Sequence, residues 1–260
     1  MNDCAVSPDG AWIVSASGDK TLKIWDVATG TERATLVGHT NSVDDCAVSP
    51  DGRWIVSASY RVLKIWDVAT GTERATLVGH TNSVKGCAVS PDGTWIVSAS
   101  EDGTLKIWDV ATTTERATLV GHTSEVRCCA VSPDGAWVVS VSYDRTLRIW
   151  DAASGNGRAL LVVPGDALAV ALHPTEPVIS WCGDHGGGVH VARLVGIDLG
   201  PLVVTAAAHS RGRFRGDDLT ARCPACRETF PVERDQLGTE TTCPNPACGR
   251  SLRLNPFTLH

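Results

Sequence analysis

The first 150 residues of the chain are built from copies of one sequence unit. The heptapeptide Cys-Ala-Val-Ser-Pro-Asp-Gly begins at Cys4, Cys46, Cys87 and Cys129. Each copy is followed by a tryptophan, by Ile-Val-Ser-Ala-Ser or a close variant, and then by Leu-(Lys/Arg)-Ile-Trp-Asp. The spacings between successive tryptophans of this last element are 41, 42 and 42 residues, at Trp25, Trp66, Trp108 and Trp150. Such a period is typical of solenoids, propellers and arrays, in which one small unit is stacked repeatedly.

Each unit is predicted to form four short β-strands. In the second copy they cover roughly residues 43–48, 54–59, 62–67 and 72–78. Segments such as Leu-Lys-Ile-Trp favour strands. The Pro-Asp-Gly and Ala-Thr-Gly tripeptides between them favour turns, because Pro fixes φ and Gly allows positive φ. One small sheet with two apolar faces cannot bury both faces alone, so the units must stack.

The unit of about 42 residues, with Gly-His and Trp-Asp elements, resembles the repeat of the WD-repeat β-propeller family. The near-identity of the copies resembles the bacterial type of these repeats. The resemblance implies an all-β protein, a β-propeller of four-stranded antiparallel blades with about five blades, and an incomplete propeller is one alternative. The units are expected at residues 1–37, 38–78, 79–120 and 121–163, with a degenerate fifth at 164–208.

The fifth unit has lost the most recognisable residues. Residues 167–173, 177–182, 188–194 and 201–208 align with the four strands of the earlier units. Val163-Pro164-Gly165-Asp166 replaces the Gly-His loop, and Ala192 takes the position of the Trp. Erosion of this kind is typical of a terminal repeat.

The polar residues of each unit form a recurring set of His, Ser, Asp and Trp. The resemblance implies that they are hydrogen-bonded structural tetrads: His80, Ser98 or Ser100, Asp102 and Trp108, and His122, Ser140 or Ser142, Asp144 and Trp150. A buried indole N–H needs an acceptor. A serine hydroxyl can accept from Trp and donate to His, while Asp fixes the His tautomer. The second unit lacks this Asp and the first lacks the His, so two complete tetrads are expected.

A Ser-His-Asp set also matches the composition of a hydrolase triad. A catalytic triad, however, is built once, beside an oxyanion hole, whereas this set recurs in successive units with a Trp attached. The three glycines at 186–188 lack the Lys-Ser/Thr ending of a phosphate-binding loop. The sequence shows no nucleophile–base pair and no open metal site. We therefore predict that the chain is not an enzyme and has no catalytic residues.

The residues that differ between the copies are better guides to specificity than the shared ones. The resemblance implies that partners bind at the top rim and channel mouth, which the loops before the first strand and the turns between the second and third strands build. The candidate partner-binding residues are Asp44, Asp45, Tyr60, Lys85, Glu101, Glu125, Arg127 and Tyr143. Tyr and Arg are enriched in protein interfaces. The alternative is a solvated rim whose residues have drifted.

The composition changes after about residue 208. An Arg-rich linker is expected at 209–220 and a zinc-ribbon-like domain at 221–260. Within that domain Cys223, Cys226, Cys243 and Cys248 follow the pattern C-x2-C-x16-C-x4-C. Two close pairs at such a separation indicate one four-thiolate Zn2+ site, which is coordinatively saturated and therefore structural. Two disulfides are the alternative, and the other cysteines of an unexported chain argue against them.

Charge and hydropathy limit the other function classes. The net charge is −6 at pH 7, and residues 208–260 hold eight Arg against six acidic residues, so nucleic acid is an improbable partner. No apolar run approaches the roughly 20 residues of a membrane span, and the first residues do not resemble a signal peptide. We expect a cytoplasmic, non-catalytic protein-interaction scaffold, a fragment or relative of a larger bacterial signalling protein. A nucleic-acid-binding protein that uses the Arg-rich linker and the ribbon is the alternative.

The register of the first unit suggests a longer ancestor. Met1 aligns with Val43, Val84 and Val126, so the unit begins at its innermost strand without a Gly-His loop. We expect that the chain is a piece of a longer propeller, and that an exposed first blade supports self-association.

Overall fold

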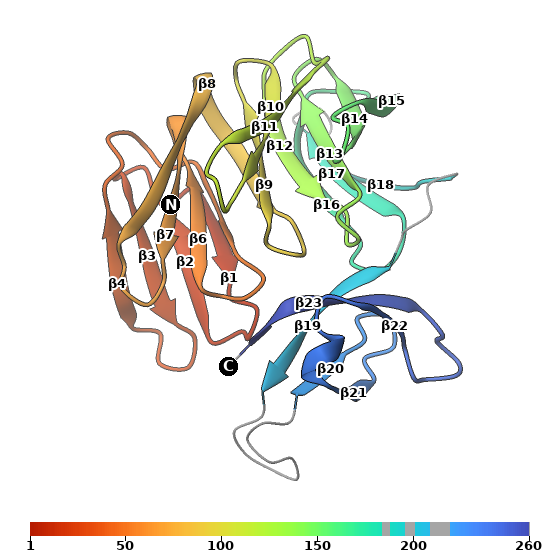
Figure 1. Ribbon diagram of the computed structural model, residues 1–260. Coiled ribbons are helices and arrows are strands. Elements are labelled where there is room, and N and C mark those ends of the chain that lie inside the picture. The colour runs from red at the N-terminus through yellow and green to blue at the C-terminus, as the bar shows by residue number, and fades with distance from the viewer. Residues whose placement is uncertain (184–187, 196–200, 209–218, 260) are drawn as a thin grey trace.

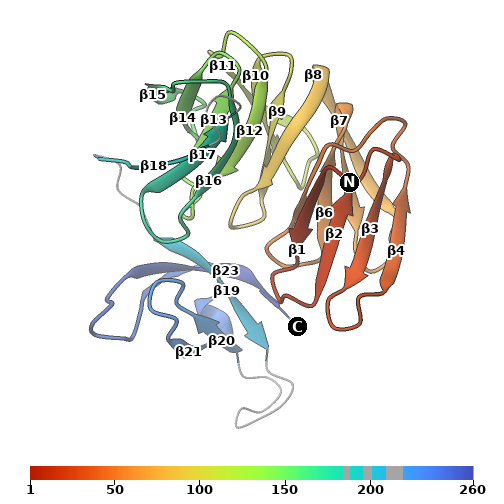
Figure 2. The ribbon, with the colours of Figure 1, turned by 180° about the vertical axis from the view of Figure 1, so that it is seen from behind.

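The computed structural model describes residues 1–183, 188–195, 201–208 and 219–259. These residues form antiparallel sheets that follow one another along an arc, with a mixed sheet below them (Figure 1, and from behind Figure 2). The predicted fold class, an all-β propeller of four-stranded blades, is confirmed. Residues 209–218 of the expected linker lie outside the described residues.

The four complete units have the same strand order. The first comprises β1 (Asp3–Val6), β2 (Trp12–Ala16), β3 (Thr21–Asp26) and β4 (Glu32–Val37). The second and third share one sheet of β5 (Asp45–Val48), β6 (Trp54–Ala58), β7 (Tyr60–Asp67), β8 (Glu73–Val89), β9 (Trp95–Ser100), β10 (Thr104–Asp109) and β11 (Glu115–Val120). The fourth comprises β12 (Val126–Val131), β13 (Trp137–Ser142), β14 (Thr146–Asp151) and β15 (Gly157–Val162). Strand β8 joins two units because it is the outer strand of one and the inner strand of the next.

The Ser-Pro-Asp-Gly turns fix the register of the first two strands in each unit. In the second unit the Ser49 hydroxyl donates to the Asp51 carboxylate over 2.6 Å and accepts the Trp54 N–H over 3.0 Å. Gly52 has φ of 69°, which a residue with a Cβ rarely adopts. The same serine and carboxylate contacts occur in the other three complete units, so the heptapeptide is a turn-forming element.

The hydrophobic core lies between the sheets. Trp12, Leu22 and Leu36 of the first unit form one cluster with Ile55 and Trp66 of the second. The second and third units, and the third and fourth, are joined by equivalent clusters. Cys46, Cys87 and Cys129 are buried in these interfaces as small apolar residues. Each unit therefore buries the apolar face of its neighbour, as the stacking argument requires.

The fifth unit compensates for its missing tryptophan. In the third unit a Cβ added at Gly79 would lie 2.9 Å from Cη2 of Trp108, so no larger residue fits there. The same close approach to a Trp occurs at Gly38 and Gly121. In the fifth unit Ala192 replaces the Trp, and Val163, which is buried, stands at the glycine position. The Gly-to-Val and Trp-to-Ala changes are thus complementary: a larger side chain at one position accompanies a smaller one at the position that packs against it.

The fifth sheet has three described strands, β16 (Ala167–Leu172), β17 (Val178–Gly183) and β18 (Val189–Arg193). The sequence predicts a fourth strand at 201–208. In the structure that segment is β19 (Leu202–Ala208), which pairs with strands of the C-terminal sheet and not with β18. Parallel pairing with a nine-residue partner strand satisfies its backbone groups there, an outcome that alignment of the repeats could not anticipate.

The C-terminal sheet has the order β21-β20-β19-β23-β22. Its other elements are β20 (Leu219–Arg222), β21 (Thr229–Val232), the 3-10 helix η1 (Arg234–Gln236), β22 (Glu240–Thr242) and β23 (Ser251–Leu259). It meets the repeats at their Ser-Pro-Asp-Gly turns. Asn255 Nδ2 donates to the Pro91 carbonyl over 3.0 Å, and the Val203 N–H donates to the Pro133 carbonyl over 3.3 Å. The sheet therefore lies below the arc, against the turns of the third and fourth units (Figures 1 and 2).

Candidate functional site

The two complete His-Ser-Asp-Trp sets have nearly identical geometry. In the third unit Trp108 Nε1 donates to Ser98 Oγ over 2.8 Å, and His80 joins Ser98 Oγ through Nε2 and Asp102 through Nδ1, each over 2.8 Å. The fourth unit has the same contacts over 2.7 to 2.8 Å, among His122, Ser140, Asp144 and Trp150. The second serine of each pair bonds backbone carbonyls instead, as Ser100 and Ser142 do.

These sets are enclosed between sheets and have no opening for a substrate. Ser98 and Ser140 are fully buried, and His80 and His122 are nearly so. Burial lowers the pKa of His122 although Asp144 acts against it. Burial acts to raise the pKa of Asp102, but hydrogen bonds from His80 and Thr104 hold it below the ordinary value. A neutral His held by a carboxylate, with a serine that no solvent reaches, is a cross-link between strands.

The set is partial in the first two units. In the second, His39 Nε2 lies 2.6 Å from Ser57 Oγ, and Trp66 Nε1 donates to the same oxygen over 2.8 Å. His39 Nδ1 has no hydrogen-bond partner among the described residues, because Arg61 follows Tyr60 where the later units have Asp. The first unit has no His: the indole N–H of Trp25 donates to the Ser15 hydroxyl over 2.9 Å, and Asp19 of the turn accepts hydrogen bonds from Thr21.

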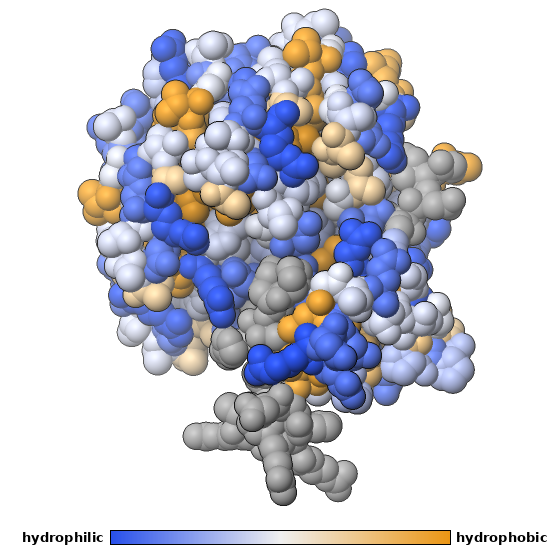
Figure 3. Space-filling view, in the orientation of Figure 1, coloured by the Kyte–Doolittle hydropathy of each residue, from blue (hydrophilic) through white to orange (hydrophobic). Residues whose placement is uncertain are grey.

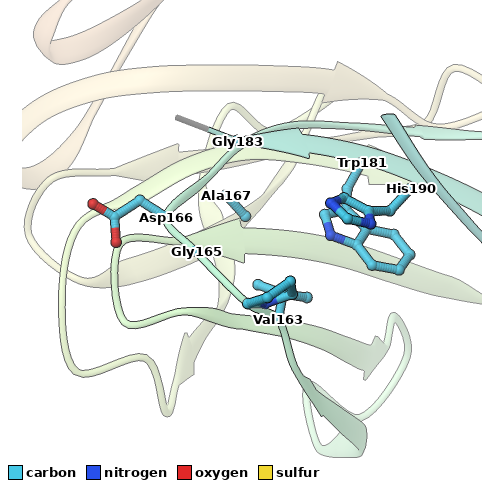
Figure 4. Close-up of a pocket in the computed structure, with 8 residues that line it drawn as sticks. Val163, Gly165, Asp166, Ala167, Trp181, Gly183 and His190 are labelled. Carbon is cyan, nitrogen blue, oxygen red and sulfur yellow. The ribbon is translucent and has the colours of Figure 1, made fainter. Parts of the chain in front are cut away.

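The fifth unit replaces the set by aromatic stacking. Trp181 takes the position of the serine on the second strand, and its ring stacks on His190 at 5.2 Å and 17°. Figure 4 shows these two rings lying together above Val163, with Asp166 pointing away from them. The cavity they line is about 10 Å3, which is room for about one water molecule. It is too small for an organic ligand.

The candidate rim residues contact one another across neighbouring units. We call the rim the end of the sheets formed by the loops before the first strands and the turns between the second and third. Lys85 Nζ lies 2.7 Å from Asp44 and 3.2 Å from Glu101. Arg127 lies 3.5 Å from Glu101 and 5.0 Å from the centre of the Tyr143 ring. The second, third and fourth units are thus linked by alternating charges.

The remaining candidates differ in their surroundings. Glu125 lies 3.5 Å from Arg127 at the edge of this network. Tyr60 is 44% exposed and carries the Arg61 guanidinium over its ring at 4.9 Å. Asp45 is turned away from the rim, since its carboxylate accepts the backbone N–H of Cys87 in the next unit.

Asp45 belongs to a seam between inner strands that sequence reasoning missed. Asp3 accepts the Cys46 N–H over 3.0 Å, as Asp45 accepts that of Cys87. Burial raises the pKa of Asp45, and the neighbouring Asp3 carboxylate raises it further. The available signal was the equivalent position of the two aspartates, each directly before the repeated Cys.

The four C-terminal cysteines come together. Their Sγ atoms all lie within 4.8 Å of one another, and the Cys223–Cys248 and Cys226–Cys243 pairs are 3.8 and 3.5 Å apart. All are free thiols, on the turns that follow β20 and β22 and precede β23. The backbone N–H of Glu228 lowers the pKa of Cys226. Four soft sulfur donors around one point fit a tetrahedral ion such as zinc.

Comparison with known families settles the class of the repeats. The family described as "WD domain, G-beta repeat" matches residues 1–26, 30–67, 71–109 and 113–151. The chain belongs to the WD40 repeat family. The four matched segments cover strands β1 to β14 of the four complete units, and β15, the fifth sheet and the C-terminal sheet lie beyond them.

Curated proteins match the chain over about one WD40 repeat. The small ribosomal subunit protein RACK1 of Saccharomyces cerevisiae is 60% identical over 30 residues, which are 12% of this chain and 9% of that protein. The probable serine/threonine-protein kinase PkwA of Thermomonospora curvata is 51% identical over 39 residues, 15% and 5% respectively. The pre-mRNA-splicing factor PRP46 of Saccharomyces cerevisiae is 45% identical over 40 residues, 15% and 9%. The chain therefore spans about a tenth or less of the length of these relatives.

The WD40 assignment agrees with the arrangement of polar residues. WD40 repeats are typically non-catalytic, and both complete Ser-His-Asp sets found among the described residues are buried. Among the described residues, no helix is long and apolar enough to span a membrane.

Proposed function

We propose that this chain is a non-catalytic scaffold that binds a protein or peptide partner on the WD40 rim. The rim network supports this proposal: the side chains that differ between units, Asp44, Lys85, Glu101, Arg127 and Tyr143, lie in mutual contact across three units. A continuous polar surface with Tyr and Arg has the chemistry of a protein interface. The charges are pre-ordered, so a partner would not have to fix them.

Photo-crosslinking can test this use of the rim. A photoreactive phenylalanine analogue is placed at Tyr60 on the rim, or at Thr29 at the opposite end as a control, and each protein is exposed to lysate of the encoding organism. One discrete adduct at Tyr60, lost in Lys85→Glu and absent at Thr29, is the expected result. Equal labelling at both positions, or no adduct that depends on Lys85, would contradict the rim as the binding surface.

We further propose that the cysteine cluster holds one structural zinc ion. The donor set and the mutual distances support this, since four thiolates leave no open coordination position. Zinc would bind the buried Cys223 and Cys243 as thiolates, offset their negative charge, and join the two cysteine turns. The ion would contribute to folding of this small sheet.

We also propose a cytoplasmic location and kinship with a larger bacterial signalling protein. The similarity of one repeat to PkwA, a bacterial protein whose name describes a probable kinase, supports the kinship. Nucleic-acid binding remains the weaker candidate, because the acidic balance of the chain opposes it.

A further inference from the structure

In the part of the chain that the structure describes, the outer edge of the fifth sheet has no counterpart of the fourth strand of the other units. In each complete unit the third strand pairs with a fourth, as β14 does with β15. Among the described residues, β18 pairs only with β17, because β19 has joined the C-terminal sheet. An edge strand presents open N–H and C=O groups and is a template for another chain.

The surface around this edge is apolar. Val189 and Val191 on β18 are 74% and 67% exposed. On the adjoining fourth unit Leu161 is 42% exposed, whereas the equivalent Leu36 and Leu119 are fully buried. Figure 3 shows apolar surface at the right-hand edge of the molecule, where Figure 1 draws β18.

An apolar cavity of about 290 Å3 adjoins the same edge. It lies between the outer strands of the fourth and fifth units and is lined by Leu147, Ile149, Leu161, Ile179, Ala192 and Leu194 among others. In the complete units an indole enters this space between sheets, as Trp150 enters between the third and fourth units. Val163 packs in the same core cluster as Ala192, and the cavity remains on the side of Ala192 that lines it. The size is near the lower limit of small-ligand pockets and suits one large side chain.

We propose that an extended segment of a partner protein adds to β18 as the fourth strand of this sheet and places a large apolar side chain in the cavity. The proposal rests on the proposed scaffold function and adds a second binding site to it. Main-chain hydrogen bonds to the strand edge would give affinity, and the cavity would give specificity.

The chain's own fourth strands define the chemistry of the partner segment. The sequence Thr-Glu-Arg-Ala-Thr-Leu-Val occurs three times, and in the third unit its Leu119 pairs with Leu105 and its Glu115 with Trp108. By the same register the partner's Leu would lie beside Val189, and its residue at the Glu position beside Ala192. Apolar contact with Val189 and Val191 therefore favours a Leu-containing strand.

The position beside Ala192 calls for a different residue from Glu. In the third unit Glu115 is held by Lys106 over 2.7 Å and lies next to the Trp108 ring. In the fifth unit His190 stands where Lys106 does, and the ring is absent. An acidic side chain would have lost its lysine, and Arg193, which also lines the cavity, is already paired with Glu176 over 2.5 Å. The rest of the lining is apolar, so a Trp or another large apolar residue fits better.

Two labelled peptides and the full chain provide the test. One is Thr-Glu-Arg-Ala-Thr-Leu-Val, and the other has Trp in place of Glu. Fluorescence anisotropy is expected to show saturable one-to-one binding of the Trp peptide, at least about tenfold tighter than binding of the Glu peptide. A Trp peptide with Asp in place of Leu should lose this affinity, because the Asp carboxylate would then lie against the apolar side chain of Val189.

A chain variant separates this site from others. Val163→Gly combined with Ala192→Trp restores the residues of the complete units and fills the cavity, and it should bring the two peptides to within about twofold of each other. Val120→Asp, an exposed apolar residue elsewhere, is the matched control and should leave the preference unchanged.

Three outcomes would overturn the proposal. The first is that neither peptide shows saturable binding up to about 1 mM. The second is that the preference for the Trp peptide persists in the variant with the filled cavity. The third is that the chain forms a dimer and that the peptide competes with dimer formation. The last result would assign the edge to a second copy. Failure here leaves the rim result intact, because the crosslinking at Tyr60 does not involve β18.

Discussion

The indole of Trp108 donates its N–H to the Ser98 hydroxyl over 2.8 Å, and this Trp–Ser bond is present in all four complete units. The His member is absent from the first unit and the Asp member from the second, whereas the Trp–Ser pair is kept in both. The pair is therefore the invariant part of the tetrad. His and Asp extend it by tying the loop before the first strand to the turn between the second and third strands.

Trp108→Phe is expected to lower the free energy of unfolding by about 1–3 kcal/mol, because the buried Ser98 hydroxyl loses its donor and the cavity gains a void. Urea denaturation followed by circular dichroism measures the change. Trp25→Phe is the control, since Trp25 is only partly buried and its serine has no His, and its effect should be smaller. Equal effects at both positions would contradict the role given to the enclosed tetrad.

His39 should make stability depend on pH. Burial lowers its pKa from 6.5 to about 4, with the Lys64 charge contributing. Above pH 6.5 the residue is neutral in both states and costs nothing. As the pH falls from 6.5 toward 4, the unfolded chain binds a proton that the folded chain does not, so stability is lost, by up to about 3 kcal/mol.

His39→Gln removes this titration while keeping a polar group near Ser57. The difference in unfolding free energy between variant and wild type should therefore change across pH 4 to 6.5 and stay constant above pH 7. Chemical denaturation at closely spaced pH values measures it. A difference that is the same at every pH would show that His39 is not buried in its neutral form.

Gly79→Ala tests the packing of the Gly-His loop on the tryptophan. The added methyl would approach Trp108 to 2.9 Å and the Glu115 carboxylate to 3.2 Å, so either the ring or the loop must shift. We expect a loss of about 1–3 kcal/mol in unfolding free energy. Gly157→Ala is the matched control, because nothing lies within 4 Å of its new Cβ, and it should be near neutral or stabilising. Equal losses in both variants would count against the close-packing explanation.

The repeat period was enough to predict the sheets but not their connections beyond the fourth unit. The turns and apolar strands of a complete unit are determined by residues that are close in the sequence. Trp66 and Ser49 therefore make the hydrogen bonds that the repeat pattern predicts. The partner of Leu202–Ala208 depends on a strand about fifty residues later, Ser251–Leu259, which alignment of repeats does not consider. Val163 likewise makes sense only once Ala192 is seen to leave space beside it.

The candidate sites show the same division. The spacing within each cysteine pair was sufficient to predict that Cys223 and Cys226 cluster with the later pair, because ligand spacing is a local property. Asp45 was expected on the rim beside Asp44, but Asp45 is the first residue of β5, and adjacent residues of extended chain point to opposite faces. Its carboxylate therefore meets the Cys87 N–H in the next unit.

The C-terminal sheet should lose its order without metal, while the WD40 repeats keep theirs. Metal analysis of the purified chain is expected to find about one zinc per chain. Cys226→Ser should release that ion and raise hydrogen exchange in β20, β21 and β22, since the buried Cys223 and Cys243 would lose the metal ion that joins them. Exchange in β9 and β10 should be unchanged, because the two parts meet mainly through turns such as that at Pro91.

Cys4→Ser, at an exposed thiol of the first unit, is the control and should retain the ion. Zinc kept by Cys226→Ser, or a wild-type chain without zinc whose four thiols react freely with a thiol reagent, would refute the metal site.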